Sequence, residues 1–446
     1  MEPQYIGTNQ HQAYSQSERA IAIMRAWDAY YGRYKRSLKV KEGAVDPNIR
    51  ANYARVLVDK ATAMLFGKEI SLDVTQDELT GDTATIDAAQ AYLDATWKHN
   101  RKMALLQKAA MNGCTSGDVF LQLVPYRPYP RIINLDPALV TVETEPMDVD
   151  SPTRFIVEWE TNEGRERLSW RQTWTNNGNH WLERLEVRSG SHADFTPHMI
   201  GLWPHPFPPI IHWQNLPVPN SYYGQPDLGD DVLHLIDRIN LTLSNWNKTV
   251  LHHAHPKQWG SGFEAEELTT AIDETTVLPN KDAKLGLLEM KGDIQVTDQL
   301  LVRLKEALYE IARLPEIATG KMQNIGVLSG LALNILYEPA LELTAQRRML
   351  AGPELEELSR RILVLGGFDA LSVSCEWPEL LPGDPELEGK VLEKDQKLGL
   401  VSDETLSRKR GYDPRKEAAR KARENKGETT TGDGPTDPTP GTAASE

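Results

Sequence analysis

The chain has 446 residues and a formal charge of −15, with 49 Lys and Arg against 64 Asp and Glu. This length predicts two to four structural units rather than a single core. The negative charge excludes a protein that binds nucleic acid by broad neutralisation of phosphates, although a few contacts with DNA are compatible with it. Two cysteines, Cys114 and Cys375, indicate no disulfide framework and favour a reducing compartment. We expect no signal peptide and no segment that crosses a membrane.

The N-terminal part of the chain is predicted to be helical. Apolar residues recur at steps of three and four, as in Ile21, Met24, Trp27 and Tyr31, which is typical of an amphipathic helix. Each of the two later helical segments, 48–66 and 83–112, is followed by a glycine, which favours the end of a helix. On this basis we expect helices over 17–36, 48–66 and 83–112, and a short strand over 70–74.

Residues 117–213 differ, because short segments rich in β-branched and aromatic residues alternate with Pro, Gly and Asn turns. This pattern predicts an antiparallel β region of six or seven strands. Its tryptophans could stack on bases or sugars. We favour instead a place in the sheet core or in a subunit contact for Trp159, Trp170, Trp174 and Trp181.

Two long amphipathic helices follow a proline-rich connector, one over 228–254 and one over 296–315. Between them we expect a turn at 260–262 and short strands at 275–279 and 284–290. The first helix has polar residues off its apolar face, namely Asp230, Asp237, Asn240 and Asn247.

A polar loop with three glycines, over 319–330, follows the second long helix. Next comes a helix over 331–365 that Pro339 and Pro353 are expected to kink. A strand and several short helices follow. The last segment, 427–446, is rich in Thr, Gly, Pro and Asp and has no large apolar residue, so we expect it to be disordered.

The sequence carries no enzyme signature. The Gly-Lys dipeptide after the second long helix lacks the first glycine of a phosphate-binding loop, and neither G-x-S-x-G nor H-E-x-x-H occurs. His252, His253 and His255 could bind a metal, but we favour a polar helix end at which imidazoles match the helix dipole. Cys114 has no adjacent His, so we favour a small packing residue over a nucleophile. We therefore expect no catalytic residue, no cofactor and no metal.

The order of these elements, with four stretches of sequence, resembles the portal proteins of tailed bacteriophages in their siphophage-type branch. None of the stretches is a catalytic signature, and their order and spacing carry the resemblance. They are NYARVLVDKATAMLFGKEI (52–70), NLPVPNSYYGQPDLGDDVLHLIDRINLTLSNW (215–246), LYEIARLPEIATGK (308–321) and GVLSGLALNILYEPALELTAQRR (326–348).

The resemblance implies an α+β, portal-like fold in a ring of twelve subunits. Such a fold has a mixed α/β wing, a two-helix stem, a small α/β clip, a kinked long helix and a helical crown. Placed on this sequence, the parts are the wing (1–226), stem helix one (227–255), the clip (256–295), stem helix two (296–316), the tunnel loop (317–330), the kinked wing helix (331–365), the crown (366–426) and a disordered tail (427–446).

The resemblance also implies roles for particular residues. The tunnel loop would narrow a DNA channel, and its candidates are Lys321, Gln323, Asn324, Val327 and Leu328, of which Lys321 is placed to touch the DNA backbone. The stem helices would pack through Leu235, Ile239, Leu243, Leu304 and Leu308. A basic tract in the crown would contact DNA through Arg415, Lys416, Arg420 and Lys421.

Plainer interpretations stand beside these roles. The basic tract equally fits a solvated helix in which Glu417 and Glu424 pair with the cations. Asp230, Asp231 and Asp237 could keep DNA mobile in a channel, but the first two also match the positive end of a helix dipole. The polar face of the first long helix is expected to point into the channel only because of the resemblance.

We therefore interpret the chain as a non-enzymatic portal protein at a capsid vertex, through which double-stranded DNA is packaged and ejected. Its expected partners are further copies of itself, the terminase large subunit of the packaging motor, the major capsid and scaffolding proteins, and a head-completion or tail adaptor protein. We expect it in the virion after assembly in the host cytoplasm. The alternatives are a hydrolytic or carbohydrate-active enzyme with a Trp-rich β domain, and a non-viral adaptor built on helical hairpins.

Overall fold

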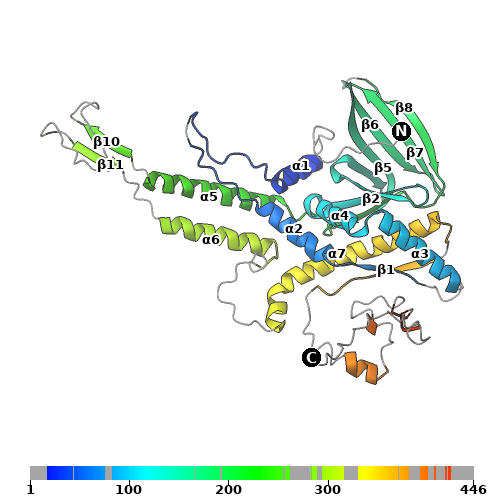
Figure 1. Ribbon diagram of the computed structural model, residues 1–446. Helices are drawn as coiled ribbons and strands as arrows, with labels where there is room; N and C mark the ends of the chain where they lie inside the picture. Colours follow the sequence, from blue (N-terminus) through cyan, green and yellow to red (C-terminus); the bar gives the residue numbers. More distant parts are fainter. Residues whose placement is uncertain are drawn as a thin grey trace, which may run out of the picture. The chain divides into compact units, whose positions relative to one another are not determined.

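The computed structural model describes most of the chain up to residue 380 and a few short segments beyond it. The chain divides into two units, Met1–Leu380 and Leu381–Glu446. The first unit combines helices with antiparallel sheets (Figure 1), which is the α+β class predicted from the sequence. No helix in the described part is long and apolar enough to cross a membrane. The described residues are 18–43, 45–75, 83–164, 166–190, 193–254, 257–261, 282, 284–288, 294–315, 330–369, 371–380, 392–399, 406–407, 417–418 and 420–422.

Four helices form the N-terminal part, and the structure corrects several of their expected boundaries. The helix expected from residue 48 begins at Tyr53, because residues 47–52 are not helical. The tract expected as one helix over 83–112 is two helices, because Arg101 adopts a left-handed φ of 54°. The first helix ends before residue 36, and Gly32 turns the chain just after it with a φ of 73°. The helices are α1 (Glu18–Tyr30), α2 (Tyr53–Phe66), α3 (Thr83–His99) and α4 (Lys102–Ser116).

Helix α4 continues past Gly113, where the sequence suggested a stop, and is followed by Gly117. Gly117 has a φ of 89°, and its backbone N–H donates to the Gly113 carbonyl. A Cβ at Gly117 would lie 2.5 Å from the carbonyl oxygen of Gly224. Glycine is therefore required here for two reasons, a left-handed turn and a close approach of two backbones.

Two antiparallel sheets fill residues 118–214, with strand orders β3-β2-β9 and β4-β5-β6-β7-β8. They contain eight strands rather than six or seven. The missed strand is β8, whose side chains are exposed almost throughout and so lack an apolar alternation. The strands are β2 (Asp118–Val124), β3 (Arg131–Leu135), β4 (Val140–Glu145, after the short helix η1, Pro137–Leu139), β5 (Asp148–Glu163), β6 (Glu166–Asn176), β7 (Trp181–Ser189), β8 (Thr196–Trp203) and β9 (Ile210–Gln214).

The tryptophans of the larger sheet pack inward. Trp159, Trp174 and Trp181 are at most 7% exposed, and they join the larger hydrophobic core together with helices α3, α4 and α7. Trp170 is partly buried against the same core. The expected packing role is confirmed, and these buried rings are not available to stack on bases or sugars.

Two long helices, α5 (Asp230–Ala254) and α6 (Ile294–Ile311), lie side by side and run in opposite directions (Figure 1). An antiparallel strand pair, β10 (Lys257–Ser261) with β11 (Lys284–Leu288), lies beyond their far end. The expected turn at 260–262 is wrong in its first two residues, because Gly260 and Ser261 belong to β10. The strand expected at 275–279 lies outside the described residues.

Helix α7 (Gly330–Leu365) is continuous although it contains Pro339 and Pro353. Figure 1 shows a bend between its short N-terminal part and its long C-terminal part. It ends as expected at a glycine pair: Gly367 has a φ of 83°, and the Phe368 N–H donates to the Leu363 carbonyl at 2.9 Å.

The strand after α7, β12 (Ser372–Glu376), pairs with β1 (Ser71–Thr75) in an antiparallel register. Its side chains also join the core formed by α3 and α7. Residues up to 380 therefore belong to the first unit, and the boundary expected at 365–366 does not separate them from it.

Candidate functional site

The α5–α6 pair is held together by one face of each helix. Ile236, Ile239 and Leu308 are fully buried in a second hydrophobic cluster, which also contains residues of α1 and α2. The residues expected to pack the stem lie in or against this cluster. Ile239 and Leu308 are inside it, and partly buried against it are Leu235, Leu243 and Leu304.

A second face of α5 is polar and buried. The Asn240 side-chain oxygen accepts from the Ala51 N–H at 2.8 Å, and the Ser244 hydroxyl accepts from the Ile49 N–H at 3.0 Å. The Asn247 amide donates to the Pro47 carbonyl at 2.9 Å. Asn240 and Ser244 are 2% and 0% exposed.

These three side chains hold the extended segment 45–51 against α5 by its backbone. Asn240 and Asn247 were expected on a face that points into a channel, and this expectation is wrong for both. The signal was present in the sequence, because positions 240, 244 and 247 share one helical face. A polar row at that spacing is equally compatible with a buried surface and with a solvated surface.

The acidic start of α5 is exposed. Asp230 and Asp237 form ion pairs with Arg25 of α1, at 2.8 and 3.8 Å. The Asp231 carboxylate accepts from the Val232 N–H at 2.8 Å, within the first turn of the helix. The local role of these carboxylates, at a helix N-terminus and beside an arginine, accounts for their positions. Exposed pairs of this kind contribute little to stability.

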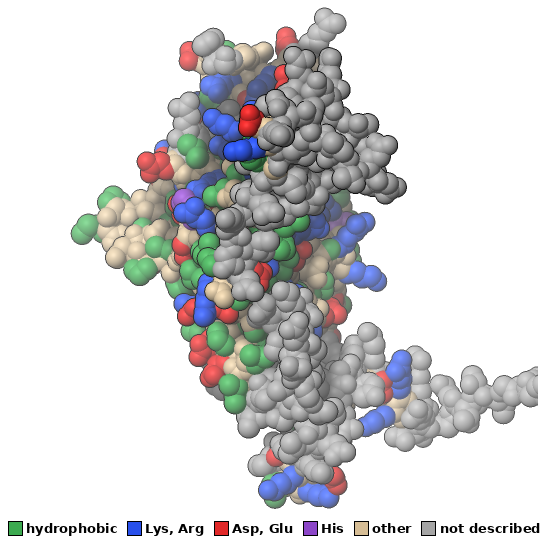
Figure 2. Space-filling view, turned by 90° about the vertical axis from the view of Figure 1, so that its left-hand side faces the viewer, with side chains coloured by type: hydrophobic (Ala, Val, Ile, Leu, Met, Phe, Trp, Pro, Cys, Tyr) green, Lys and Arg blue, Asp and Glu red, His purple; other side chains and the backbone are tan. Residues whose placement is uncertain are grey.

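Helix α6 leaves apolar side chains uncovered within the chain. Val296, Leu300 and Ile311 are 60%, 51% and 47% exposed. Leu300 and Ile311 are eleven residues apart, which is about three helical turns and keeps them on one face. The described part of the surface in Figure 2 intersperses hydrophobic, basic and acidic side chains, so charge of neither sign dominates it.

A buried ion pair positions the chain just before α5. Asp227 accepts from the guanidinium of Arg347 on α7, which is 3% exposed. Burial disfavours the charged guanidinium, but the charge and hydrogen bond of Asp227, together with the charge of Cys114, outweigh it and raise the pKa of Arg347. Cys114 lies beside the pair and is fully buried, and burial followed by the charge of Asp227 raises the pKa of its thiol. Cys114 is therefore an inert packing residue, as expected.

A second buried carboxylate ties the N-terminal helix to the sheets. Asp118 has a fully buried side chain and accepts from Arg19 of α1 at 2.7 Å and from the Gly224 N–H at 2.8 Å. His212 of β9 contacts its other side at 2.9 Å. Arg19 also lies over the ring of Tyr223 at 3.8 Å. Sequence patterns could not predict this cluster, because its members are far apart along the chain.

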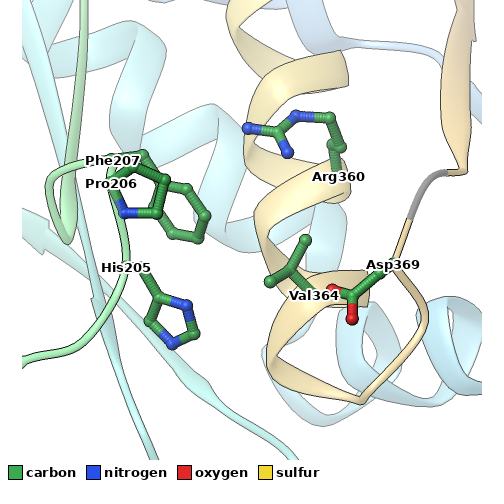
Figure 3. Close-up of a pocket in the computed structure, with 6 residues that line it drawn as sticks. All are labelled: His205, Pro206, Phe207, Arg360, Val364 and Asp369. Carbon is green, nitrogen blue, oxygen red and sulfur yellow. The ribbon is translucent and has the colours of Figure 1, made fainter. Parts of the chain in front are cut away.

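A pocket of about 450 Å³ lies between the loop after β8 and the end of α7 (Figure 3). Its lining consists of His205, Pro206, Phe207, Arg360, Val364 and Asp369. Arg360 is already bound to both carboxylate oxygens of Glu357, at 2.6 and 2.7 Å. Burial lowers the pKa of His205, while the charge of Asp369 opposes this change. The lining holds no nucleophile beside a base.

Several expected site residues cannot be placed. The tunnel-loop residues Lys321, Gln323, Asn324, Val327 and Leu328 lie outside the described residues, as do Arg415 and Lys416. Of the histidine cluster, His255 and the side chains of His252 and His253 also lie outside them. Arg420 pairs with Glu417 at 2.7 Å, and Lys421 is exposed. Among the described residues no group of acidic, His and Cys side chains could hold a metal ion.

Comparison with known proteins identifies the family. The sequence matches the family model "Phage portal protein, SPP1 Gp6-like" over residues 10–431. No match is found among curated proteins. A chain from the structure "Neck of empty GTA particle computed with C6 symmetry" is similar with a TM-score of 0.51 and 14% identity, over 90% of this chain and 95% of that one; this likeness concerns the fold. The chain therefore belongs to the phage portal protein family, whose members are structural proteins and not enzymes.

Proposed function

We propose that this portal protein forms a ring of twelve subunits at a capsid vertex, and that double-stranded DNA enters and leaves through the channel of the ring. Membership in the portal family implies an oligomeric ring associated with the capsid and the tail. The observation that carries the proposal is the outward apolar row on α6, Val296, Leu300 and Ile311. Leu301 and Leu308 of α6 are buried in the cluster that contains α5, whereas this row is not covered by the chain itself.

A neighbouring subunit is the partner that fits this row. Next to the row, Arg303, Glu306 and Glu310 are exposed, so apolar and charged side chains of both signs alternate around it. Ring neighbours meet through two different surfaces, one from each subunit. We infer that α6 of one subunit covers α5 or α6 of the next, with the charged residues at the rim.

The parts of the chain take the following roles in this proposal. Residues 227–255 and 296–316 form the stem, and 317–330 the tunnel loop, in which Lys321 meets the DNA backbone. The clip, 256–295, offers its surface to the terminase large subunit and later to a head-completion or tail adaptor protein. The wing, extended to residue 380 by β12, contacts the major capsid and scaffolding proteins. The crown is then confined to 381–426, with Arg415, Lys416, Arg420 and Lys421 near DNA, and assembly takes place in the host cytoplasm.

The α6 interface is tested by Leu300→Asp, with Glu306→Asp as the control at another exposed position of the same helix. A charge buried at a subunit contact disfavours association strongly, so we expect Leu300→Asp to shift the purified chain from rings to monomers. The control should assemble normally. Normal rings from Leu300→Asp would show that the row does not face a neighbour.

The tunnel loop is tested by deleting residues 323–327. We expect rings of unchanged subunit number that package or retain less DNA, measured as DNA content per particle. If ring assembly is lost instead, the loop is mainly an interface between subunits.

A further inference from the structure

The larger sheet has one bare edge. Its strand order places β4 at one end and β8 at the other. The outward N–H and C=O groups of an edge strand need partners, and an open edge is a template for a strand of another chain. The two edges of this sheet differ in whether side chains of the same chain bind those outward groups.

The β4 edge is closed by side chains of the same chain. The Tyr223 hydroxyl accepts from the Val142 N–H at 2.8 Å, and Arg19 donates to the Val140 carbonyl at 3.2 Å. Both groups point away from β5, because their partners come from outside the sheet. A further strand cannot pair here without displacing Tyr223 and Arg19.

The edges of two other sheets are closed in the same way. On β1, the Gln90 amide accepts from Val74 and donates to Leu72, at 2.7 and 3.0 Å. The remaining edges each have one such contact. These are Glu356 to the Cys375 N–H of β12 at 2.9 Å, Asn100 to the Ile132 N–H of β3 at 2.9 Å, and Arg361 to the Ile210 carbonyl of β9 at 3.3 Å.

Strand β8 has no such closure within the described residues. Its sequence, TPHMIGLW, contains no Lys, Arg, Asp or Glu, although charged side chains are a common protection of edge strands. Pro197 and the register shift opposite Leu185 and Glu186 protect its first part, so the unprotected edge is residues 199–203. Ile200 and Leu202 are 74% and 62% exposed. Leu182 of β7 is paired with Leu202 and is 39% exposed, so the apolar surface extends one strand into the sheet.

We propose that the β8 edge receives an extended segment of a different protein, which adds to the sheet as a sixth strand. Only another strand satisfies a row of alternating N–H and C=O groups. The segment has apolar side chains at alternate positions, where they cover Ile200 and Leu202. It carries no charge opposite them.

A second copy of this chain is a poorer occupant. Its described sheet edges at β1, β3, β4, β9 and β12 carry side-chain contacts. The edges of the β10–β11 pair carry none among the described residues, and a cross-link to either of these strands would identify a second copy as the occupant. Pairing β8 with the β8 of a neighbour needs a two-fold relation, whereas ring neighbours are related head to tail. This step rests on the ring of the proposed function, but the chemistry of the edge does not.

The proposal is tested in particles assembled with the full-length chain carrying p-benzoylphenylalanine at position 200 or, as control, at position 149. Val149 lies on β5 and is 37% exposed. After irradiation, the cross-linked peptides are sequenced. Amide exchange of β8 and β4 is compared between particles and isolated rings.

We expect the cross-link from position 200 to map to one segment of one other protein, with no such product from position 149. Amides of β8 should exchange at least tenfold more slowly in particles, while those of β4 stay unchanged. A synthetic peptide of the cross-linked segment should bind isolated rings, and Ile200→Lys should abolish that binding where Val149→Lys does not.

A cross-link to another copy of this chain, or β8 exchange that is equal in particles and rings, would overturn the proposal. So would binding of the peptide to Ile200→Lys rings. The subunit number is measured separately by native mass. The proposed ring and the proposed strand addition can therefore fail independently.

Discussion

The two hydrophobic clusters differ in how completely the chain covers them. Around the sheets, buried tryptophans fill the core. In the two sheets of residues 118–214 and in the β1–β12 pair, side chains of the same chain contact every strand edge except β8. Around α5 and α6, Ile236 and Leu308 are fully buried, but the apolar row on α6 is exposed. The first region is nearly complete within one chain. The second region has the character of half an interface, since contiguous exposed apolar surface marks a site of association.

The largest expected effect tests the link between the two regions, the ion pair of Asp227 and Arg347. Arg347→Met leaves the Asp227 carboxylate buried without its partner, and should lower the free energy of unfolding by about 3–5 kcal/mol. The loss is measured by urea denaturation at a fixed protein concentration. The double variant Arg347→Met, Asp227→Leu should recover most of it. An unchanged midpoint in the single variant would show that the pair does not join the regions.

The next effect separates the covered from the uncovered half of α6. Leu308→Ala should cost about 2–5 kcal/mol of stability, because Leu308 is fully buried. Leu300→Ala, at a side chain that is 51% exposed, should change the stability of the dissociated chain by less than about 0.5 kcal/mol. Its effect should appear in ring assembly, followed by light scattering. Equal losses of chain stability would contradict the division of α6 into two halves.

A smaller effect tests the polar row on α5. Ser244→Ala leaves the partly buried N–H of Ile49 without its acceptor, which should cost about 1–2 kcal/mol. Exchange of the Ile49 amide should become faster, and this is measured by NMR or mass spectrometry. Asn245→Ala, at the adjacent exposed position, is the control and should change neither quantity.

The smallest effect concerns pH and the contact of α1 with α2. Burial, followed by the hydrogen bond to Asp59, raises the pKa of Tyr30 to about 12. The folded chain therefore holds this proton more tightly than the unfolded chain. The contribution of protonated Tyr30 to the stability of the fold is complete below pH 10 and is lost as the pH rises to 12. Between pH 10 and pH 12, the free energy of unfolding of Tyr30→Phe should therefore fall by about 1–2 kcal/mol less than that of the parent chain. If the free energies of unfolding of the two proteins change in parallel with pH, Tyr30 does not contribute to the pH dependence of stability.

Periodicity predicted what the chain does locally, and it failed where distant residues decide. The long helices, the glycine stop after α7 and the inward tryptophans follow from spacing. Strand β8 was missed because an exposed edge strand has no apolar alternation. The placement of Asn240 depends on the backbone of segment 45–51, and the Asp118 cluster joins three separate elements. The spacing of 240, 244 and 247 indicates a polar row but not the segment that it binds, and the Asp118 cluster has no signal within one window of sequence.

The proposed ring is tested by native mass measurement of the purified protein. We expect a single species of about twelve chains with a central hole in electron micrographs, and its conversion to monomers by Leu300→Asp. A stable monomer of the unmodified chain, above all one that turns over a glycan, would show that the protein does not act as a ring.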